Sequence, residues 1–386
     1  MKLTIEKFER NGLYLSCLLR FGDMADNLTV KVNDIAVLYL TLDRIDAVVV
    51  GFLLFAMKNG YDIASDYPIS KDLYFALTKQ FIPSMCAAHP KYHMVRIDAP
   101  MIDAPHEKDS LRTLIGTGIS CGVDSLYTIY SDLLSEVPEE MKVNTLFFFN
   151  VGAAMKGSTE LRTNLVDGRL QQAKKFADEY KFDFIFMESN IHLLINKYAN
   201  YSHIEQHTYM ALFCLYLIQK GIKTYYYSSG YSLLDFDARA NDSASYDIYT
   251  LGMMSLNGMH LYSGGGEKSR LEKVSALVKW KPAQQYLNVC VNSIQNDNTC
   301  FKCVRTMLEI DAVGDINDFK SVFDIDFYKR NYKAYLRRLY INAKIKKDSC
   351  SVEIYAILKT KITFVMKLQF LFSIIINKLL KRKSVV

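Results

Sequence analysis

The sequence predicts an α/β protein built on a parallel sheet. From about residue 111 onward, apolar runs that suit buried strands alternate with segments of helical periodicity. The chain has 386 residues, and its 50% hydrophobic fraction is ample for more than one core. We expect three parts: an α/β accessory domain over 1–110, a central α/β domain over 111–310 and a helical region over 311–386.

The first part shows short alternating segments and one long apolar run. We expect a strand at 28–32 and a buried helix at 45–57, which is too short to span a bilayer. Ser70 is the predicted N-cap of a helix over 71–81. Three charged residues near the apolar run are interpreted as a solvated helix start, with a functional role as the alternative: Asp43, Arg44 and Asp46.

A linker marked by Pro100, Pro105 and charged residues 107–109 leads into the central part. Strands and helices are then expected in turn, at strand 145–151, helix 161–180, strand 182–187, helix 204–219 and strand 223–227. Ligands of parallel sheets bind beyond the carboxyl ends of the strands. We therefore expect the site among the loops at 120–125, 150–152, 188–190 and 228–231.

The loop Ser-Cys-Gly-Val-Asp-Ser at 120–125 follows an apolar run and opens a periodic helix. A helix N-terminus presents unpaired N–H groups and a positive dipole end, which together favour a phosphate. Gly122 allows close approach of a ligand, and Asp124 suits a divalent cation shared with that phosphate. The loop predicts a nucleotide site; the alternative is an ordinary capped turn.

This loop resembles the S-G-G-x-D-S signature of the PP-loop ATP pyrophosphatases, the adenine nucleotide α-hydrolase-like group, with Cys121 in place of the first glycine. The resemblance implies a Rossmann-like, HUP-like domain that binds ATP and Mg²⁺ and cleaves ATP between its α- and β-phosphates. It implies nucleotide contacts from Ser120, Cys121, Gly122, Val123, Asp124, Ser125, Asn150, Gly152, Ser229 and Gly230.

A cysteine cluster lies downstream, where Cys300 and Cys303 have zinc-knuckle spacing and Cys290 precedes them. The cluster resembles that of 7-cyano-7-deazaguanine synthase, a PP-loop family with four such cysteines. Asp297 stands where the fourth would be, and a carboxylate can bind zinc. We expect Zn²⁺ on these four residues, with free thiols packed under a loop as the alternative.

Two further groups are candidates. His203 and His207 lie one helical turn apart, which suits metal ligands, phosphate donors or partly buried structural histidines. A glycine turn at 264–266 precedes Lys268, Arg270 and Lys273, and the family resemblance implies that such a turn supplies a cation to the phosphates. The expected catalytic residues are Asp124, Ser125, Arg270 and Lys273, with a solvated basic surface as the alternative for the turn.

The resemblance implies an ATP-dependent carbon–nitrogen ligase. A small-molecule or macromolecular acceptor with a carboxylate or amide would be adenylated, pyrophosphate released, and AMP displaced by a nitrogen nucleophile. The alternative is a catalytically degenerate nucleotide-binding regulatory or scaffold protein, because Cys121 and Asp297 both depart from the family pattern.

The remaining expectations concern location and partners. Eight dispersed cysteines and the lack of a signal-peptide core at the N-terminus predict a cytoplasmic protein, and a net charge of +6 gives no support for specific nucleic-acid binding. The apolar and basic residues 368–383 predict a helix that docks on its own protein or on a twin subunit in a homodimer. Membrane-surface contact is the alternative for this tail.

Overall fold

The computed structural model describes residues 1–104, 113–134, 137–153 and 159–370. The chain forms two compact units. The first contains Met1–Ser120 and Thr128–Glu267, and the second contains Cys121–Tyr127 together with the residues from Lys268 onward. The predicted linker residues 105–109 and most of the apolar and basic tail lie outside the described residues.

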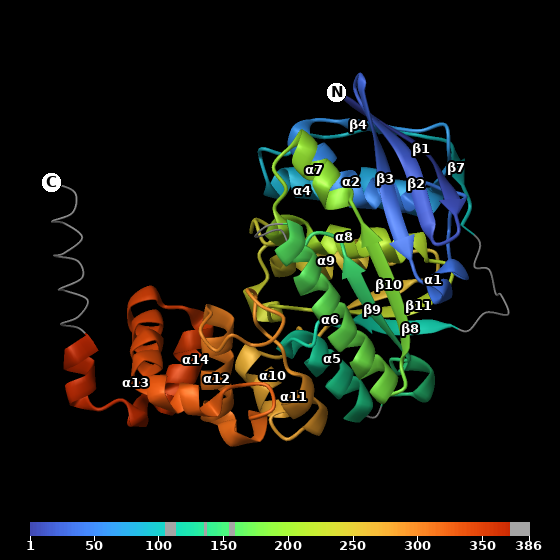
Figure 1. The fold of residues 1–386 in the computed structure, drawn as a ribbon. Helices are drawn as coiled ribbons and strands as arrows, with labels where there is room; N and C mark the ends of the chain where they lie inside the picture. The colour runs from blue at the N-terminus through green and yellow to red at the C-terminus, as the bar shows by residue number, and fades with distance from the viewer. Residues whose placement is uncertain (105–112, 135–136, 154–158, 371–386) are drawn as a thin grey trace. The chain divides into compact units, whose positions relative to one another are not determined.

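The first unit is built on a ten-stranded sheet, shown in Figure 1. Five neighbouring strands are parallel, which confirms the α/β class and the predicted parallel sheet. The strand order across the sheet is β12 (His260–Gly264), β11 (Ile222–Ser228), β8 (Leu114–Gly118), β9 (Thr145–Asn150), β10 (Asp183–Ser189), β3 (Met24–Val32), β2 (Tyr14–Phe21), β1 (Lys2–Asn11), β4 (Asp62–Ala64) and β6 (Ile97–Asp98). A second, two-stranded sheet pairs β5 (Ile69–Ser70) with β7 (Met101–Ile102).

The three-part division at 110 and 310 is wrong for two physical reasons. Strand β3 pairs antiparallel with β10, placing Val32 opposite Met187, so the N-terminal strands extend the central sheet instead of forming a sheet of their own. At the other boundary, helix α12 (Phe301–Val313) runs through residue 310 and belongs wholly to the second unit.

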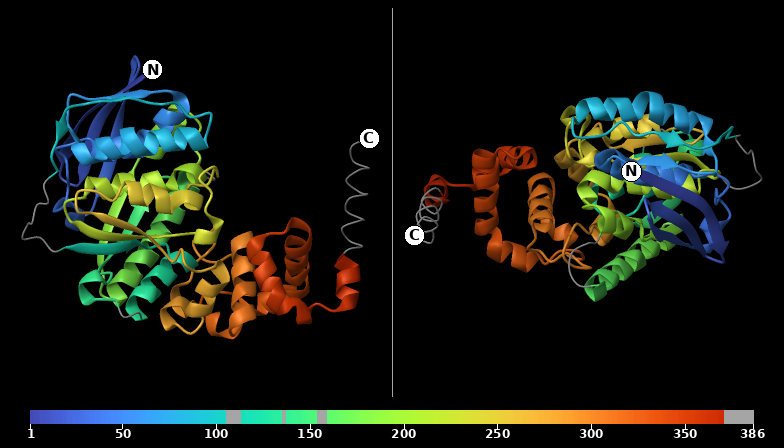
Figure 2. Two further views of the ribbon diagram at one scale, coloured as in Figure 1. Left: turned by 180° about the vertical axis from the view of Figure 1, so that it is seen from behind. Right: turned by 90° about the horizontal axis from the view of Figure 1, so that it is seen from above.

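The predicted buried helix at 45–57 is confirmed as α2 (Asp46–Asn59), in which every side chain from Asp46 to Met57 is buried. It packs along α8 (His203–Leu217), and Figure 2 shows these helices side by side. Both helices are enclosed by other elements, which explains why neither has a marked polar face. The remaining helices of this unit are α1 (Asp34–Val37), α3 (Lys71–Phe75), α4 (Ile82–Ala88), α6 (Thr159–Glu179), α7 (Ile191–Tyr198) and α9 (Asp247–Met253).

The solvated helix start expected around residue 45 is wrong. Asp46 is fully buried and accepts hydrogen bonds from the backbone N–H of Ser70 at 2.9 Å and from Gln219 Nε2 at 3.3 Å. Arg44 is also buried and donates to Ser70 Oγ at 3.4 Å. Ser70 precedes α3 as predicted, but its hydroxyl contacts Asp46 and does not cap the helix. The predicted helix over 71–81 is α3 followed by a π-helical turn, Ala76–Phe81.

The second unit is helical, as expected for the C-terminal region. Its described helices after residue 268 are α10 (Arg270–Leu277), α11 (Lys281–Tyr286), α12 (Phe301–Val313), α13 (Ile325–Ile341) and α14 (Ser349–Leu358). Helix α12 packs against α10, α13 and α14. Among the residues that the structure describes, no helix has both the length and the apolar character needed to cross a bilayer.

Candidate functional site

The loop at 120–125 forms the predicted strand-to-helix turn. Strand β8 ends at Gly118 and helix α5 (Val123–Leu134) begins after Gly122. Cys121 has a φ of 56°, in the left-handed region that favours glycine. The turn is fixed by a hydrogen bond from Asn288 N to Cys121 O at 2.8 Å and by one from Ser125 Oγ to Gly122 O at 3.1 Å. The backbone conformation at Cys121 is thus one that glycine adopts without strain.

The Cys121 side chain is only 1% exposed. Burial raises the pKa of its thiol to about 12, so the thiol is protonated at neutral pH. Because the thiolate is the reactive form of cysteine, Cys121 cannot serve as a nucleophile in this state.

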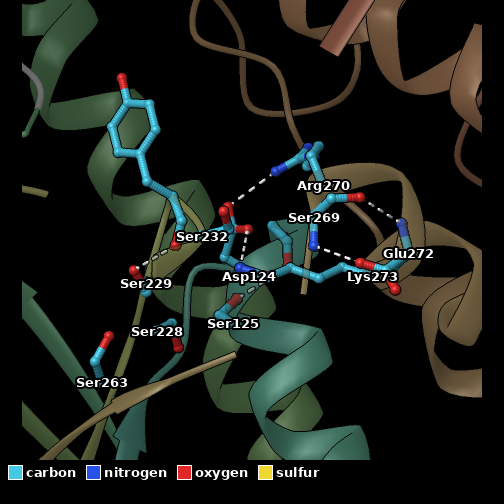
Figure 3. Close-up of polar contacts among 12 residues, drawn as sticks. Asp124, Ser125, Ser228, Ser229, Ser232, Ser263, Ser269, Arg270, Glu272 and Lys273 are labelled. Carbon is cyan, nitrogen blue, oxygen red and sulfur yellow. Dashed lines mark hydrogen bonds and ion pairs between the residues drawn. The ribbon is translucent and has the colours of Figure 1, made fainter. Parts of the chain in front are cut away.

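The expected basic turn and the loop aspartate come together in the second unit, as Figure 3 shows. Arg270 Nη1 contacts Asp124 Oδ2 at 2.9 Å, and Lys273 Nζ contacts Asp124 Oδ1 at 3.4 Å. The Lys273 side chain is 2% exposed, which is rare for a lysine and requires such a partner. A capping box between Ser269 and Glu272 fixes the first turn of α10, from which both cations project.

Helix α12 supports Arg270 from the other side. Glu309 Oε2 accepts from Arg270 Nε at 3.5 Å, and Thr306 Oγ1 accepts from Arg270 Nη2 at 3.4 Å. Glu309 also pairs with Arg305 at 3.5 Å. The carboxylates of Asp124 and Glu309 thus pair with three cations, Arg270, Lys273 and Arg305. Burial alone would lower the pKa of Arg270, but the neighbouring carboxylates of Asp124 and Glu309 raise it.

Sequence reasoning missed Glu309 and included Lys268. Glu309 is fully buried, and the only sequence signal for it is the i, i+4 spacing from Arg305. Lys268 instead pairs with Glu272 at 3.6 Å, and its side chain is 44% exposed. It therefore lies on the surface of the second unit and does not contact Asp124.

The four predicted metal ligands converge. The Sγ atoms of Cys290, Cys300 and Cys303 and a carboxylate oxygen of Asp297 all lie within 4.8 Å of one another, and all three cysteines are buried. Burial alone would raise the pKa of the Cys290 thiol, but its hydrogen bonds with the Ser293 hydroxyl and with the Asn292 N–H lower it. Three sulfurs and one carboxylate oxygen form a donor set that suits a tetrahedral zinc ion.

Asp297 is also held by its own loop. Its Oδ1 accepts from Thr299 N at 2.9 Å and from Cys300 N at 2.8 Å. Despite an opposing effect of burial, these N–H donors hold the pKa of Asp297 well below its usual range. The carboxylate is therefore charged and positioned before any metal binds.

The other expected nucleotide contacts lie in the first unit. Asn150 ends β9, and Gly152 follows it with a φ of 113°, where an added Cβ would lie 2.5 Å from Tyr201 Oη. Ser229 follows β11; its N–H donates to Gly264 O at 2.9 Å, and Gly230 after it is exposed. The structure thus places these residues at carboxyl ends of parallel strands, as predicted.

His203 and His207 lie in the first turns of α8. His203 Nδ1 contacts Tyr201 Oη at 3.3 Å, whereas His207 contacts Tyr227 Oη at 2.6 Å and Asp242 Oδ1 at 3.2 Å. In the described part of the chain, one group of three or more cysteine, histidine or acidic side chains is close enough to share a metal ion, namely the cysteine and aspartate group, and it contains neither histidine. Tyr227 and Asp242 were not candidates from the sequence.

Comparison with protein-family models, with curated proteins and with solved structures finds no match for this chain.

Proposed function

We propose that the chain is an ATP-dependent carbon–nitrogen ligase of the PP-loop type. Mg-ATP binds at Ser120–Ser125, an acceptor carboxylate or amide oxygen attacks the α-phosphorus, and pyrophosphate leaves with the electrons of the broken P–O bond. A nitrogen nucleophile then displaces AMP. The observation that carries the proposal is the contact of Asp124 with Arg270 and Lys273. These cations lie 146 and 149 positions after Asp124 in the sequence, so the fold brings together the loop and the basic turn that the resemblance assigns to one site.

The chemistry asks the chain mainly for positioning and charge. Pyrophosphate develops negative charge as it departs, and preorganised cations that face this charge lower the barrier. Arg270 and Lys273 are such cations, held in place by Glu309 and by the α10 cap. A Mg²⁺ ion bound by Asp124 would neutralise part of the phosphate charge. The N-terminus of α5 adds the positive end of a helix dipole.

We propose a structural zinc ion at Cys290, Asp297, Cys300 and Cys303. The donor set supports this assignment, and so does the separation of the cluster from Asp124 in the sequence, which follows the 7-cyano-7-deazaguanine synthase layout. Such an ion would stabilise the loop that precedes α12 by linking its two ends. It would take no part in the reaction.

One observation favours the alternative of a nucleotide-binding protein without catalysis. The Asp124 carboxylate is already neutralised by two cations, so a Mg²⁺ ion must compete with them. A chain that cannot make this exchange would bind nucleotide weakly or without turnover. Turnover of Mg-ATP separates the two proposals.

Calorimetry of Mg-ATP binding tests the assignment of the loop. We expect Asp124→Ala to weaken the magnesium-dependent affinity by about tenfold or more, the loss typical of a charged contact. The matched control is Asp326→Ala, which removes an exposed aspartate from the first turn of α13 in the same unit. Equal affinities of the wild type and the Asp124 variant would contradict the proposal.

A further inference from the structure

A second polar cluster lies within the first unit, at the carboxyl end of the parallel sheet. Tyr227 projects from the end of β11, His207 from α8, and Asp242 from the loop before α9. His207 Nδ1 lies 2.6 Å from Tyr227 Oη, and His207 Nε2 lies 3.2 Å from Asp242 Oδ1. A phenol, an imidazole and a carboxylate are thus joined in line.

The direction of each hydrogen bond follows from the chemistry of the groups. Asp242 accepts from the backbone N–H of Ala244 at 3.0 Å and from Tyr231 Oη at 3.2 Å. Burial alone would raise the pKa of Asp242, but hydrogen bonds lower it, and the bond from His207 contributes most to this lowering. The Asp242 carboxylate is therefore charged and can only accept hydrogen bonds. His207 Nε2 must then be the donor. In the neutral ring, Nδ1 is left with a lone pair that accepts the Tyr227 O–H.

A second carboxyl group at the same edge, Asp247, has a raised pKa, whereas the pKa of Asp242 is lowered. Asp247 is buried and accepts from Ser229 Oγ at 3.1 Å and from Ser263 Oγ at 3.2 Å. Burial raises the pKa of Asp247 to about 6, and the group is near enough to interact electrostatically with Tyr227 and His207. Carboxyl groups whose surroundings push their pKa values apart are a mark of acid–base sites.

We propose that Tyr227, His207 and Asp242 form a proton relay that accepts a proton from the nucleophile of the reaction. That the nucleophile is an amine rests on the proposed function. The amine nitrogen forms a bond to the activated carbon, and AMP leaves with the electrons of the broken C–O bond. The amine proton passes to Tyr227 Oη while the phenol proton passes to His207 Nδ1. Asp242 stabilises the resulting imidazolium.

The relay predicts a chemical property that needs no substrate. Burial holds the pKa of the Tyr227 phenol well above its usual value, so its reaction with an electrophile depends on passing the phenol proton to His207. With phenylmethanesulfonyl fluoride, the Tyr227 oxygen attacks sulfur, the S–F bond breaks, fluoride leaves, and the phenol proton passes to His207. Tyr14, 58% exposed on β2, serves as the internal control.

The test measures the labelling rates of both tyrosines by peptide mass spectrometry on the full chain at neutral pH. We expect both His207→Asn and Asp242→Asn to reduce the Tyr227 rate by roughly tenfold to a hundredfold, toward the low end of general-base effects. Tyr227→Phe should remove that label.

Asp242→Asn retains the imidazole and an oxygen that can accept from Ala244, so it alters the relay with little change to the fold. An unchanged Tyr14 rate and circular dichroism spectrum report folding in each variant. Equal Tyr227 rates in wild type and both variants would overturn the relay, and so would the absence of a Tyr227 label in wild type under conditions that label Tyr14. Since no nucleotide is present, that result would leave the ATP assignment standing, and failure of ATP binding would leave the relay standing.

Discussion

The left-handed backbone of Cys121 predicts how the free energies of unfolding of two variants, Cys121→Gly and Cys121→Ala, compare. At ordinary φ angles, glycine is less stable than alanine by about 0.5–1 kcal/mol, because it loses more backbone entropy on folding. At a φ of 56° this deficit of the glycine variant should largely disappear, since a Cβ in this region is strained by about 1–2 kcal/mol. The comparison of Cys121→Gly with Cys121→Ala isolates this effect because both variants lose the thiol.

The expected magnitude follows from these two opposing effects. Strain relief favours Cys121→Gly, whereas backbone entropy and the loss of one buried methyl group, about 0.8 kcal/mol, disfavour it. Where alanine is incompatible with the native backbone, measured penalties exceed about 0.4–1 kcal/mol. On these numbers the opposing effects nearly cancel, so we expect Cys121→Gly and Cys121→Ala to differ by less than about 1 kcal/mol, whereas at an unstrained position Cys121→Gly would be less stable by more than about 1 kcal/mol. Relative to wild type, Cys121→Ala should lose about 1 kcal/mol for its buried sulfur.

Urea unfolding followed by tryptophan fluorescence is a suitable assay. The chain has a single tryptophan, Trp280, at the start of α11 in the same unit as Cys121. Its signal therefore reports the unfolding of the unit in question. A glycine variant less stable than the alanine variant by more than about 1 kcal/mol would refute strain in the backbone of the loop.

Three further predictions concern charge, metal and pH. Arg270→Ala and Lys273→Ala should each lower the rate of pyrophosphate release by roughly tenfold to a thousandfold, whereas Lys268→Ala on the surface should not; equal rates in all three would contradict a role in charge stabilisation. Purified protein should carry about one equivalent of zinc, and Cys300→Ser should lower both zinc content and thermal midpoint relative to a Cys350→Ser control; metal-free protein of unaltered stability would favour free thiols. The pKa of Asp247 is raised from 3.8 to about 6 on folding, so its stabilisation is full below pH 4 and lost as the pH rises through about 6. Between pH 4 and 8 the free energy of unfolding should therefore fall by on the order of 2–3 kcal/mol more in wild type than in Asp247→Asn, and parallel pH profiles would refute the shift.

Local patterns predicted the elements well and the long-range pairings poorly. The strand-to-helix loop at 120–125 and the helix at 45–57 follow from residues close together in sequence. The pairing of β3 with β10 joins segments more than 150 positions apart, and no periodicity records which strand is the neighbour. The error about Asp46 has the same origin, because its partner Gln219 is 173 positions away and a buried, satisfied carboxylate has the same local sequence as a solvated one.

The candidate sites show the same division. The cysteine cluster and the basic turn were found because spacing and residue type carry the chemistry. Glu309 and Asp242 were missed because each acts through a partner brought to it by the fold. The left-handed conformation of Cys121 was also not visible, since a cysteine gives no signal for a positive φ.

The products formed from ATP test the central proposal most directly. Phosphorus NMR of the full chain incubated with Mg-ATP, in which water takes the place of the acceptor as the attacking nucleophile, distinguishes cleavage at the α-phosphorus from cleavage at the γ-phosphorus. We predict AMP and pyrophosphate, because the loop and its cations hold the β- and γ-phosphates as the leaving group. The signals of both products should be lost in Asp124→Ala. Formation of ADP and inorganic phosphate would contradict it.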